Sequence, residues 1–168
     1  MGEKPAKCYR YQDRPAYTRR EYIKGAPDPR IRIFDMGNKG GKFEYAVHLV
    51  VLERGQIRDR ALEAARVAAH NYLREHIGLD NYHLRIRVYP HHVLREHKLL
   101  GAAKAERLQK GMRLAFGKPV GRAARVRRFQ EIITVYTNER YLDEAKEALR
   151  RAKYKVAMPC KIVVEKLS

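Results

Sequence analysis

Nine lysine and arginine residues lie between Gly101 and Arg128, and Glu106 is the one acidic residue among them. This segment has a net charge of +8, close to half of the +18 of the whole chain. Ammonium and guanidinium groups donate charge-assisted hydrogen bonds to phosphate oxygens, whereas an ordinary solvated charge run mixes both signs. The segment therefore predicts a site for a phosphate-rich polymer. Its cations are Lys104, Arg107, Lys110, Arg113, Lys118, Arg122, Arg125, Arg127 and Arg128.

Glycine and proline interrupt the same segment, and both discourage a continuous helix or strand. They occur at Gly101, Gly111, Gly117, Pro119 and Gly121. We therefore expect a long, flexible basic loop over residues 101–121 that projects from the domain. Such a loop becomes ordered when it meets phosphates, so that binding bears the entropic cost of ordering.

Residues 1–30 predict an extended basic arm, because four prolines in this stretch fix φ and remove backbone donors. Tyrosines and cations alternate along it, a mixture suited to stacking on bases and pairing with phosphates. The alternative is that the arm coats its own domain, with the tyrosines as a small satellite core, and the two roles can coexist. The tyrosines are Tyr9, Tyr11, Tyr17 and Tyr22, and the cations assigned to RNA are Arg10, Arg14, Arg19, Arg20 and Lys24.

His91, His92 and His97 form the one cluster that suggests a metal site or acid–base chemistry. Adjacent histidines usually point apart, and no cysteine or carboxylate at ligand spacing completes a metal site. Their cationic neighbours favour stacking on RNA or hydrogen bonding to it. We therefore predict no metal, and we assign His91, His92 and Arg95 to RNA binding.

The chain lacks the residues of an enzyme. The segment Gly37–Lys42 resembles a phosphate-binding loop, but it is one residue short and Phe43 stands where a magnesium-binding Ser or Thr is required. Ser168 is the only serine, so a serine nucleophile is excluded. Glu106 stands alone among cations and is better suited to pairing with them than to acting as a general base. The sequence predicts neither catalysis nor a cofactor.

The charge of +18 and the pI near 10.2 restrict the class of partner. A surplus of this size repels itself unless a polyanion neutralises it, and nucleic acid is the commonest cellular polyanion. An anionic membrane is the alternative, but it calls for a basic amphipathic helix, and the helices expected here are charge-balanced. Cys8 and Cys160 are expected to be reduced thiols, and no apolar run approaches the ~20 residues of a spanning helix. We expect a cytoplasmic protein.

Hydrophobic periodicity predicts one compact α+β domain over residues 31–168. Apolar residues recur at helical spacing from about Gln56 to Ile77, and again after Asn138, which is suited to be an N-cap. The alternation over Tyr82–Tyr89 places His83, Arg85 and Arg87 on an outer, basic face. Further strands are expected at Ile31–Met36, Phe43–Leu52, Ala123–Thr137 (one strand or two) and Lys161–Glu165.

The segment AERLQKGMRLAFGKPVGRAARV, Ala105–Val126, resembles the signature of the archaeal and eukaryotic large-subunit ribosomal proteins called L-ten-e, the counterparts of bacterial L-sixteen. The family pattern begins Ala-Asp-Arg, and Glu106 preserves the charge of the aspartate. The likeness extends over the whole chain, through Ala6–Tyr11, Ile31–Lys39, Ala61–Tyr72, Arg85–Leu100 and Glu147–Lys155.

This resemblance implies an α/β-hammerhead-like domain, with two helices on a mixed or antiparallel sheet, docked in large-subunit rRNA near the tRNA sites. It implies that the loop over Gly101–Gly117 points toward the peptidyl-transferase centre and helps to place tRNA, while rRNA performs catalysis. It further implies neighbouring ribosomal proteins, late assembly factors, and a monomer within the ribosome. Two alternatives remain: an RNA-modifying enzyme or its RNA-binding subunit, and an RNA-binding factor that acts away from the ribosome.

Overall fold

Two antiparallel sheets and two α-helices make up the described part of the chain. The computed structural model describes residues 4–12, 14–97 and 117–167. The larger sheet has the strand order β1-β4-β7-β2-β8, and each neighbouring pair is antiparallel. Its strands are β1 (Asp35–Gly37), β2 (Tyr45–Val51), β4 (Tyr82–Ile86), β7 (Glu131–Thr137) and β8 (Cys160–Lys166).

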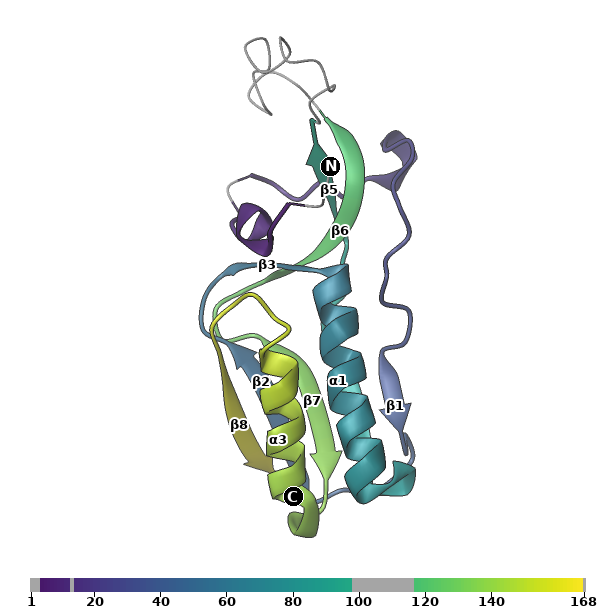
Figure 1. Ribbon diagram of the computed structural model, residues 1–168, viewed down its shortest axis with the longest axis vertical. Coiled ribbons are helices and arrows are strands. Elements are labelled where there is room, and N and C mark those ends of the chain that lie inside the picture. The colour runs from purple at the N-terminus through teal and green to yellow at the C-terminus, as the bar shows by residue number, and fades with distance from the viewer. Residues whose placement is uncertain (1–3, 13, 98–116, 168) are drawn as a thin grey trace.

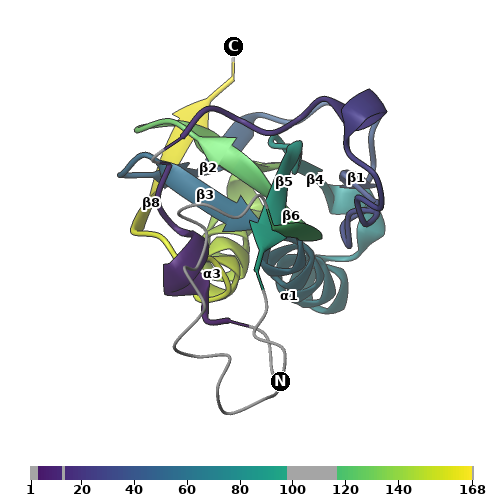
Figure 2. The same cartoon turned by 90° about the horizontal axis from the view of Figure 1, so that it is seen from above.

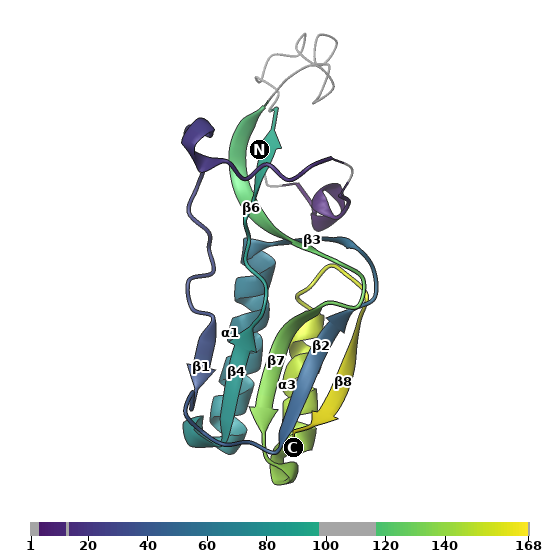
Figure 3. The ribbon, with the colours of Figure 1, turned by 180° about the vertical axis from the view of Figure 1, so that it is seen from behind.

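Helices α1 (Asp59–Ile77) and α3 (Leu142–Lys153) cover one face of the larger sheet (Figure 1), and Figure 3 shows the opposite face from behind. Buried alanines lie on both helices, and Leu49, Leu84 and Ile133 of the sheet belong to the same hydrophobic core. Each large aliphatic side chain buried in this way contributes about 1.5–3 kcal/mol. This packing confirms the predicted α+β class with two helices on a sheet. The buried apolar residues of the two helices all belong to the periodic stripes expected from the sequence: Leu62, Ala65, Ala69, Leu73 and Ile77 of α1, and Ala145, Ala148, Leu149 and Ala152 of α3.

The smaller sheet has the order β3-β6-β5 and consists of β3 (Gly55–Arg58), β6 (Lys118–Val126) and β5 (His92–Glu96). It lies at the end of the molecule where α1 begins, because β3 leads directly into α1 (Figure 1). Figure 2 looks down on this end and shows the N-terminal arm passing around the three strands. The arm contains two short 3-10 turns, Ala6–Tyr9 and Arg20–Tyr22.

Several predicted boundaries near the smaller sheet are wrong. The predicted helix from Gln56 begins at Asp59, because Gln56–Arg58 pair with β6 in the register Gln56↔Arg125 and Arg58↔Ala123. Strand β5 was not predicted, and Lys118–Gly121, expected in the projecting loop, belong to β6. In each case hydrogen bonding to a strand distant in sequence decides the structure, and local propensity cannot register such pairing.

Other differences concern element ends. The strand predicted at Ile31–Met36 is reduced to β1, and Ile33 is 51% exposed although Ile31 is fully buried. A 3-10 turn over Glu139–Tyr141 precedes α3, and the Asn138 side chain makes no capping hydrogen bond. The alternation over Tyr82–Tyr89 is confirmed in burial, since Tyr82, Leu84, Ile86 and Val88 are all buried.

Candidate nucleic-acid interface

The N-terminal arm is joined to the smaller sheet through backbone groups. The Gln56 amide donates to the Arg10 carbonyl at 2.8 Å, and the Val93 amide donates to the Tyr17 carbonyl at 2.9 Å. The Tyr17 amide in turn donates to Nδ1 of His92 at 2.9 Å. Because proline prevents the arm from forming a regular helix or strand, its backbone amides and carbonyls need partners elsewhere. These bonds to the smaller sheet supply such partners. The arm and the smaller sheet therefore form one continuous surface, which we call the arm end.

Two arginines predicted to bind phosphate make hydrogen bonds that hold the arm in place. Arg122 is only 3% exposed, and its Nε donates to the Pro27 carbonyl at 2.7 Å. Arg125 donates to the Arg14 carbonyl at 2.5 Å and to Oε1 of Gln56 at 3.1 Å. These contacts give both side chains a structural role at the base of the arm, and they leave Arg122 buried away from solvent.

The four arm tyrosines divide into two pairs. The Tyr9 hydroxyl donates to Glu96 at 3.2 Å, the Arg58 guanidinium lies 5.4 Å from the Tyr9 ring centre, and burial followed by the charge of Glu96 raises the pKa of Tyr9 to about 12. Tyr17 lies beneath the Arg95 guanidinium at 4.7 Å. By contrast, Tyr11 is 72% exposed and Tyr22 is 74% exposed. One pair anchors the arm, and the other presents open ring faces to solvent.

Cations of the arm differ in whether a carboxylate neutralises them. Arg10 pairs with Glu53 at 2.5 Å, and Lys4 pairs with Glu96 at 3.4 Å. The other four arm cations that were assigned to RNA from the sequence are exposed and form no ion pair within residues 4–12, 14–97 and 117–167. A charge without a protein partner remains available for a phosphate. These four cations are Arg14, Arg19, Arg20 and Lys24.

The outer face of β4 is less basic than predicted. The Nε2 atom of His83 lies 2.9 Å from Oδ1 of Asp35, and Nε of Arg85 lies 3.7 Å from the same oxygen. Arg87 pairs with Glu131 at 3.1 Å. The carboxylates come from the adjacent strand β1 and from the start of β7, so the sequence of β4 alone could not reveal them. This face carries internally paired charges, in contrast with the arm.

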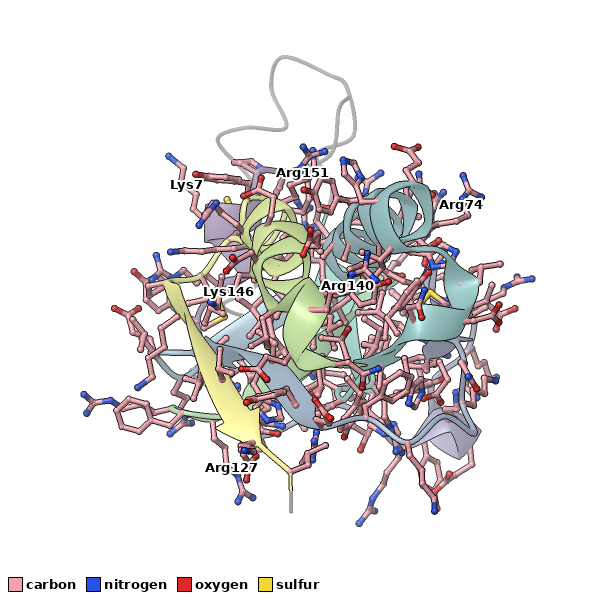
Figure 4. The ribbon with its side chains drawn as sticks, turned by 90° about the horizontal axis from the view of Figure 1, so that it is seen from below. Lys7, Arg74, Arg127, Arg140, Lys146 and Arg151 are labelled. Atoms are coloured by element: carbon pink, nitrogen blue, oxygen red, sulfur yellow. The ribbon has the colours of Figure 1, made fainter. Side chains whose placement is uncertain are left out.

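The helix layer also neutralises its own charges. Lys146 pairs with Asp143 at 3.1 Å, and Arg151 lies 3.4 Å from Glu147. Figure 4 shows Arg74, Arg140, Lys146 and Arg151 around the two helices, and Arg127 on the other side of the larger sheet. Pairs at three and four residues along a helix are the ordinary pattern of a solvated helical surface. The layer therefore presents fewer unpaired cations to a polyanion than the arm does.

The histidine pair is engaged in protein contacts. The His91 ring lies 4.4 Å from the Tyr89 ring, and Nδ1 of His92 accepts the Tyr17 amide described above. Within the described residues no group of three or more histidine, cysteine or acidic side chains could hold a metal ion. Of the predicted RNA-binding residues of the loop, Lys118 begins β6, and Lys104, Arg107, Lys110 and Arg113 lie outside the described residues.

Phe129 is an unforeseen feature of the turn between β6 and β7. Its φ is +64°, a conformation that costs an L-residue about 1–2 kcal/mol, and its ring is 56% exposed. The Arg128 guanidinium lies 4.7 Å from the ring centre and Nζ of Lys161 lies 5.6 Å from it. With exposed Arg127 beside it, the turn joins an aromatic face to predicted phosphate-binding cations. Only a positive φ could have drawn attention to it, and sequence does not reveal φ.

We expect Phe129→Gly to be more stable than Phe129→Ala by about 1 kcal/mol. Both variants lose the ring and its cation contacts, but only glycine adopts a positive φ without steric cost. Urea unfolding of the two purified variants measures the difference. Equal midpoints and slopes for the two would contradict the strain assigned to this turn.

No helix in the described part of the chain combines the length and the apolar character that crossing a membrane requires.

Comparison with known proteins gives a consistent relationship. A family model described as ribosomal protein L16p/L10e matches residues 12–163. The large ribosomal subunit protein uL16 of Hyperthermus butylicus is 54% identical over 169 residues, which cover 98% of this chain and 94% of the relative. The protein of the same name from Archaeoglobus fulgidus is 54% identical over 166 residues (99% and 95%), and that from Staphylothermus marinus 53% over 167 residues (99% and 96%). The chain therefore belongs to the L16p/L10e family of ribosomal proteins.

Proposed function

We propose that this family member is a structural, non-enzymatic protein of the large ribosomal subunit in the cytoplasm, and that it docks on large-subunit rRNA through the arm end. The observation that carries the proposal is the distribution of charge. The exposed arm cations Arg14, Arg19, Arg20 and Lys24 form no ion pair within the described residues. In contrast, several cations of the helix layer and of the outer sheet face have carboxylate partners: Arg85, Arg87, Lys146 and Arg151. The binding free energy of a polyanion is most favourable at cations that are not already paired with a protein carboxylate.

The basic segment between β5 and β6 supports a second part of the proposal, contact with tRNA. Glu96 and Lys118 are paired across β5 and β6, so the segment that joins these strands starts and ends at the arm end. Its sequence is strongly cationic. We propose that residues 101–117 reach from the rRNA-bound arm end toward tRNA near the peptidyl-transferase centre, as the family resemblance implies. Neighbouring ribosomal proteins and late assembly factors are the other expected partners of a single copy of this chain.

Deletion of Ala102–Lys110 separates docking from tRNA placement. We expect the shortened protein to fold and to co-sediment with the large subunit at moderate salt, because the arm end is intact. Particles carrying it should synthesise peptide more slowly than particles with the full chain. A matched variant with Lys104, Arg107 and Lys110 changed to glutamine keeps the length and tests the charge alone.

Sedimentation also separates the competing functions. Release of the full chain only at strong salt supports a ribosomal protein, whereas a free RNA-binding factor stays near the top of the gradient at moderate salt. A shortened protein that fails to fold would place residues 102–110 in the core and contradict the proposed projection.

A further inference from the structure

We infer that the cavity between the arm and the smaller sheet is a binding pocket for one unpaired nucleotide of RNA. The inference rests on the proposed function and deepens it, because it gives the arm end a specific subsite. The cavity has a volume of about 300 Å³ and lies between the first residues of the arm and strands β3, β5 and β6. That volume is at the lower end of the ~300–1,000 Å³ range of small-molecule sites, so it suits a single nucleotide.

The charge of the cavity selects an anion. Its lining includes Lys4, Arg14, Arg95 and Arg125, and no carboxylate lines it within the described part of the chain. The Lys4 side chain is 49% exposed, although Glu96 lies 3.4 Å from its Nζ. Arg14 is exposed, and its backbone carbonyl is held by Arg125. The Arg14 guanidinium is thus attached to a fixed backbone and remains available to a phosphate oxygen.

Apolar and aromatic groups complete the site. Pro15, Val93 and Leu94 line the cavity beside Tyr11, which is 72% exposed. Within the described residues the Tyr11 side chain has no hydrogen-bond partner or ring contact. An exposed tyrosine face beside a cationic rim is the combination with which proteins stack an unstacked base and bind its phosphate. An acidic peptide would satisfy the cations but would leave the aromatic face without a planar partner.

The geometry also distinguishes a single strand from a duplex. The cavity is bounded by the arm on one side and by the strands on the other, and paired bases of a duplex have their faces covered by stacking. Only a nucleotide displaced from a helix, or one in a loop or bulge, can present its base to Tyr11. We therefore expect the pocket to take an extruded nucleotide while neighbouring phosphates contact the arm cations.

The chain contains a built-in reporter of occupancy. Cys8 lines the cavity and is exposed, whereas Cys160 is 3% exposed and burial raises its pKa to about 11. Because the thiolate is the reactive form, iodoacetamide should alkylate Cys8 in the folded protein and leave Cys160 unmodified. A nucleotide in the cavity should shield Cys8. Cys160 serves as an internal control for unfolding.

The experiment measures Cys8 alkylation of the full chain with three probes at one ionic strength. We expect short single-stranded oligoadenylate to slow alkylation, and the same strand annealed to oligouridylate to slow it much less. Polyglutamate should give little protection. Equal protection by the duplex would mean that general electrostatic attraction, and not a pocket for an unpaired base, shields Cys8. Equal or better protection by polyglutamate would mean that the cavity binds an acidic peptide. Either result overturns the inference.

Variants give the second test. Tyr11→Ala should weaken the protective binding of oligoadenylate by about five- to a hundredfold, the effect of losing one base–aromatic stack, and Arg14→Ala should also weaken it. Tyr154→Ala and Arg74→Ala are matched controls, since Tyr154 is 79% exposed, Arg74 lies in the last turn of α1, and neither residue lines the cavity or belongs to the arm. If oligoadenylate protects Cys8 in Tyr11→Ala and in Arg14→Ala as well as it does in the original chain, the proposed nucleotide pocket is wrong. Co-sedimentation with the large subunit would still test the proposed function independently.

Discussion

Replacing Arg14, Arg19, Arg20 and Lys24 together by alanine is expected to flatten the salt dependence of rRNA binding by about three units of log K against log salt. Each neutralised phosphate contributes roughly 0.7–0.9 to that slope through release of counterions. The four side chains are exposed and form no ion pair within the described residues. Their loss should therefore weaken binding strongly at low salt and much less at high salt. Titration of the purified protein against large-subunit rRNA at several salt concentrations measures both effects.

The matched control removes four cations from the helix layer. Alanine at Arg74, Arg140, Lys146 and Arg151 lowers the net charge by the same amount, and these side chains lie around α1 and α3 (Figure 4). We expect the slope to change by less than about one unit, because these four residues lie outside the arm end, and Lys146 and Arg151 are already paired with carboxylates. Similar slopes for the two quadruple variants would show that net charge, and not the arm end, determines rRNA affinity.

Gly55→Ala is expected to lower the free energy of unfolding by about 1–3 kcal/mol, the usual cost of overpacking, and to loosen the arm. A Cβ at Gly55 would lie 2.8 Å from the Arg10 carbonyl oxygen and 2.7 Å from Cε of Met158. The end of the methionine side chain can move at little cost. The carbonyl cannot move without disturbing the 2.8 Å hydrogen bond that it accepts from the Gln56 amide. The strain should therefore fall on the attachment of the arm.

Gly121→Ala is the control, because a Cβ at Gly121 meets nothing within 4 Å. In urea unfolding, the stability of Gly121→Ala should be close to that of the original protein. Trypsin should cleave the arm faster only in Gly55→Ala. Since the arm carries the proposed rRNA contacts, Gly55→Ala should also bind rRNA more weakly. An unchanged stability and unchanged cleavage of the arm in Gly55→Ala would mean that the arm is not held at this point.

The periodic elements could be predicted from sequence because their signal is local. The stripe of α1 and the alternation of β4 follow directly from which faces must be buried, and the structure confirms both. Strand β3 could not be predicted in the same way. Gln56–Arg58 continue the helical spacing of the residues that follow, and only their pairing with β6 makes them a strand.

The candidate site shows a similar division. Sequence identified the cationic arm and its tyrosines, but it could not separate the anchors from the exposed groups. Arg122 and Arg14 are both arginines in basic segments, and sequence alone does not distinguish them. In the structure Arg122 is buried against the Pro27 carbonyl, whereas Arg14 is exposed at the cavity. The carboxylates that neutralise Arg85 and Arg87 lie on other strands. Such distinctions depend on tertiary neighbours, which composition and spacing do not specify.

Acetylation of lysines in the rRNA-bound protein tests most directly the claim that RNA covers the arm end. Lys24 and Lys118 are exposed at that end, whereas Lys146 lies on α3 with its side chain 40% exposed. Mass spectrometry before and after addition of large-subunit rRNA gives the change in labelling at each site. We expect rRNA to protect Lys24 and Lys118 and to leave Lys146 as reactive as in the free protein. Protection of Lys146 with continued labelling of Lys24 and Lys118 would contradict the account.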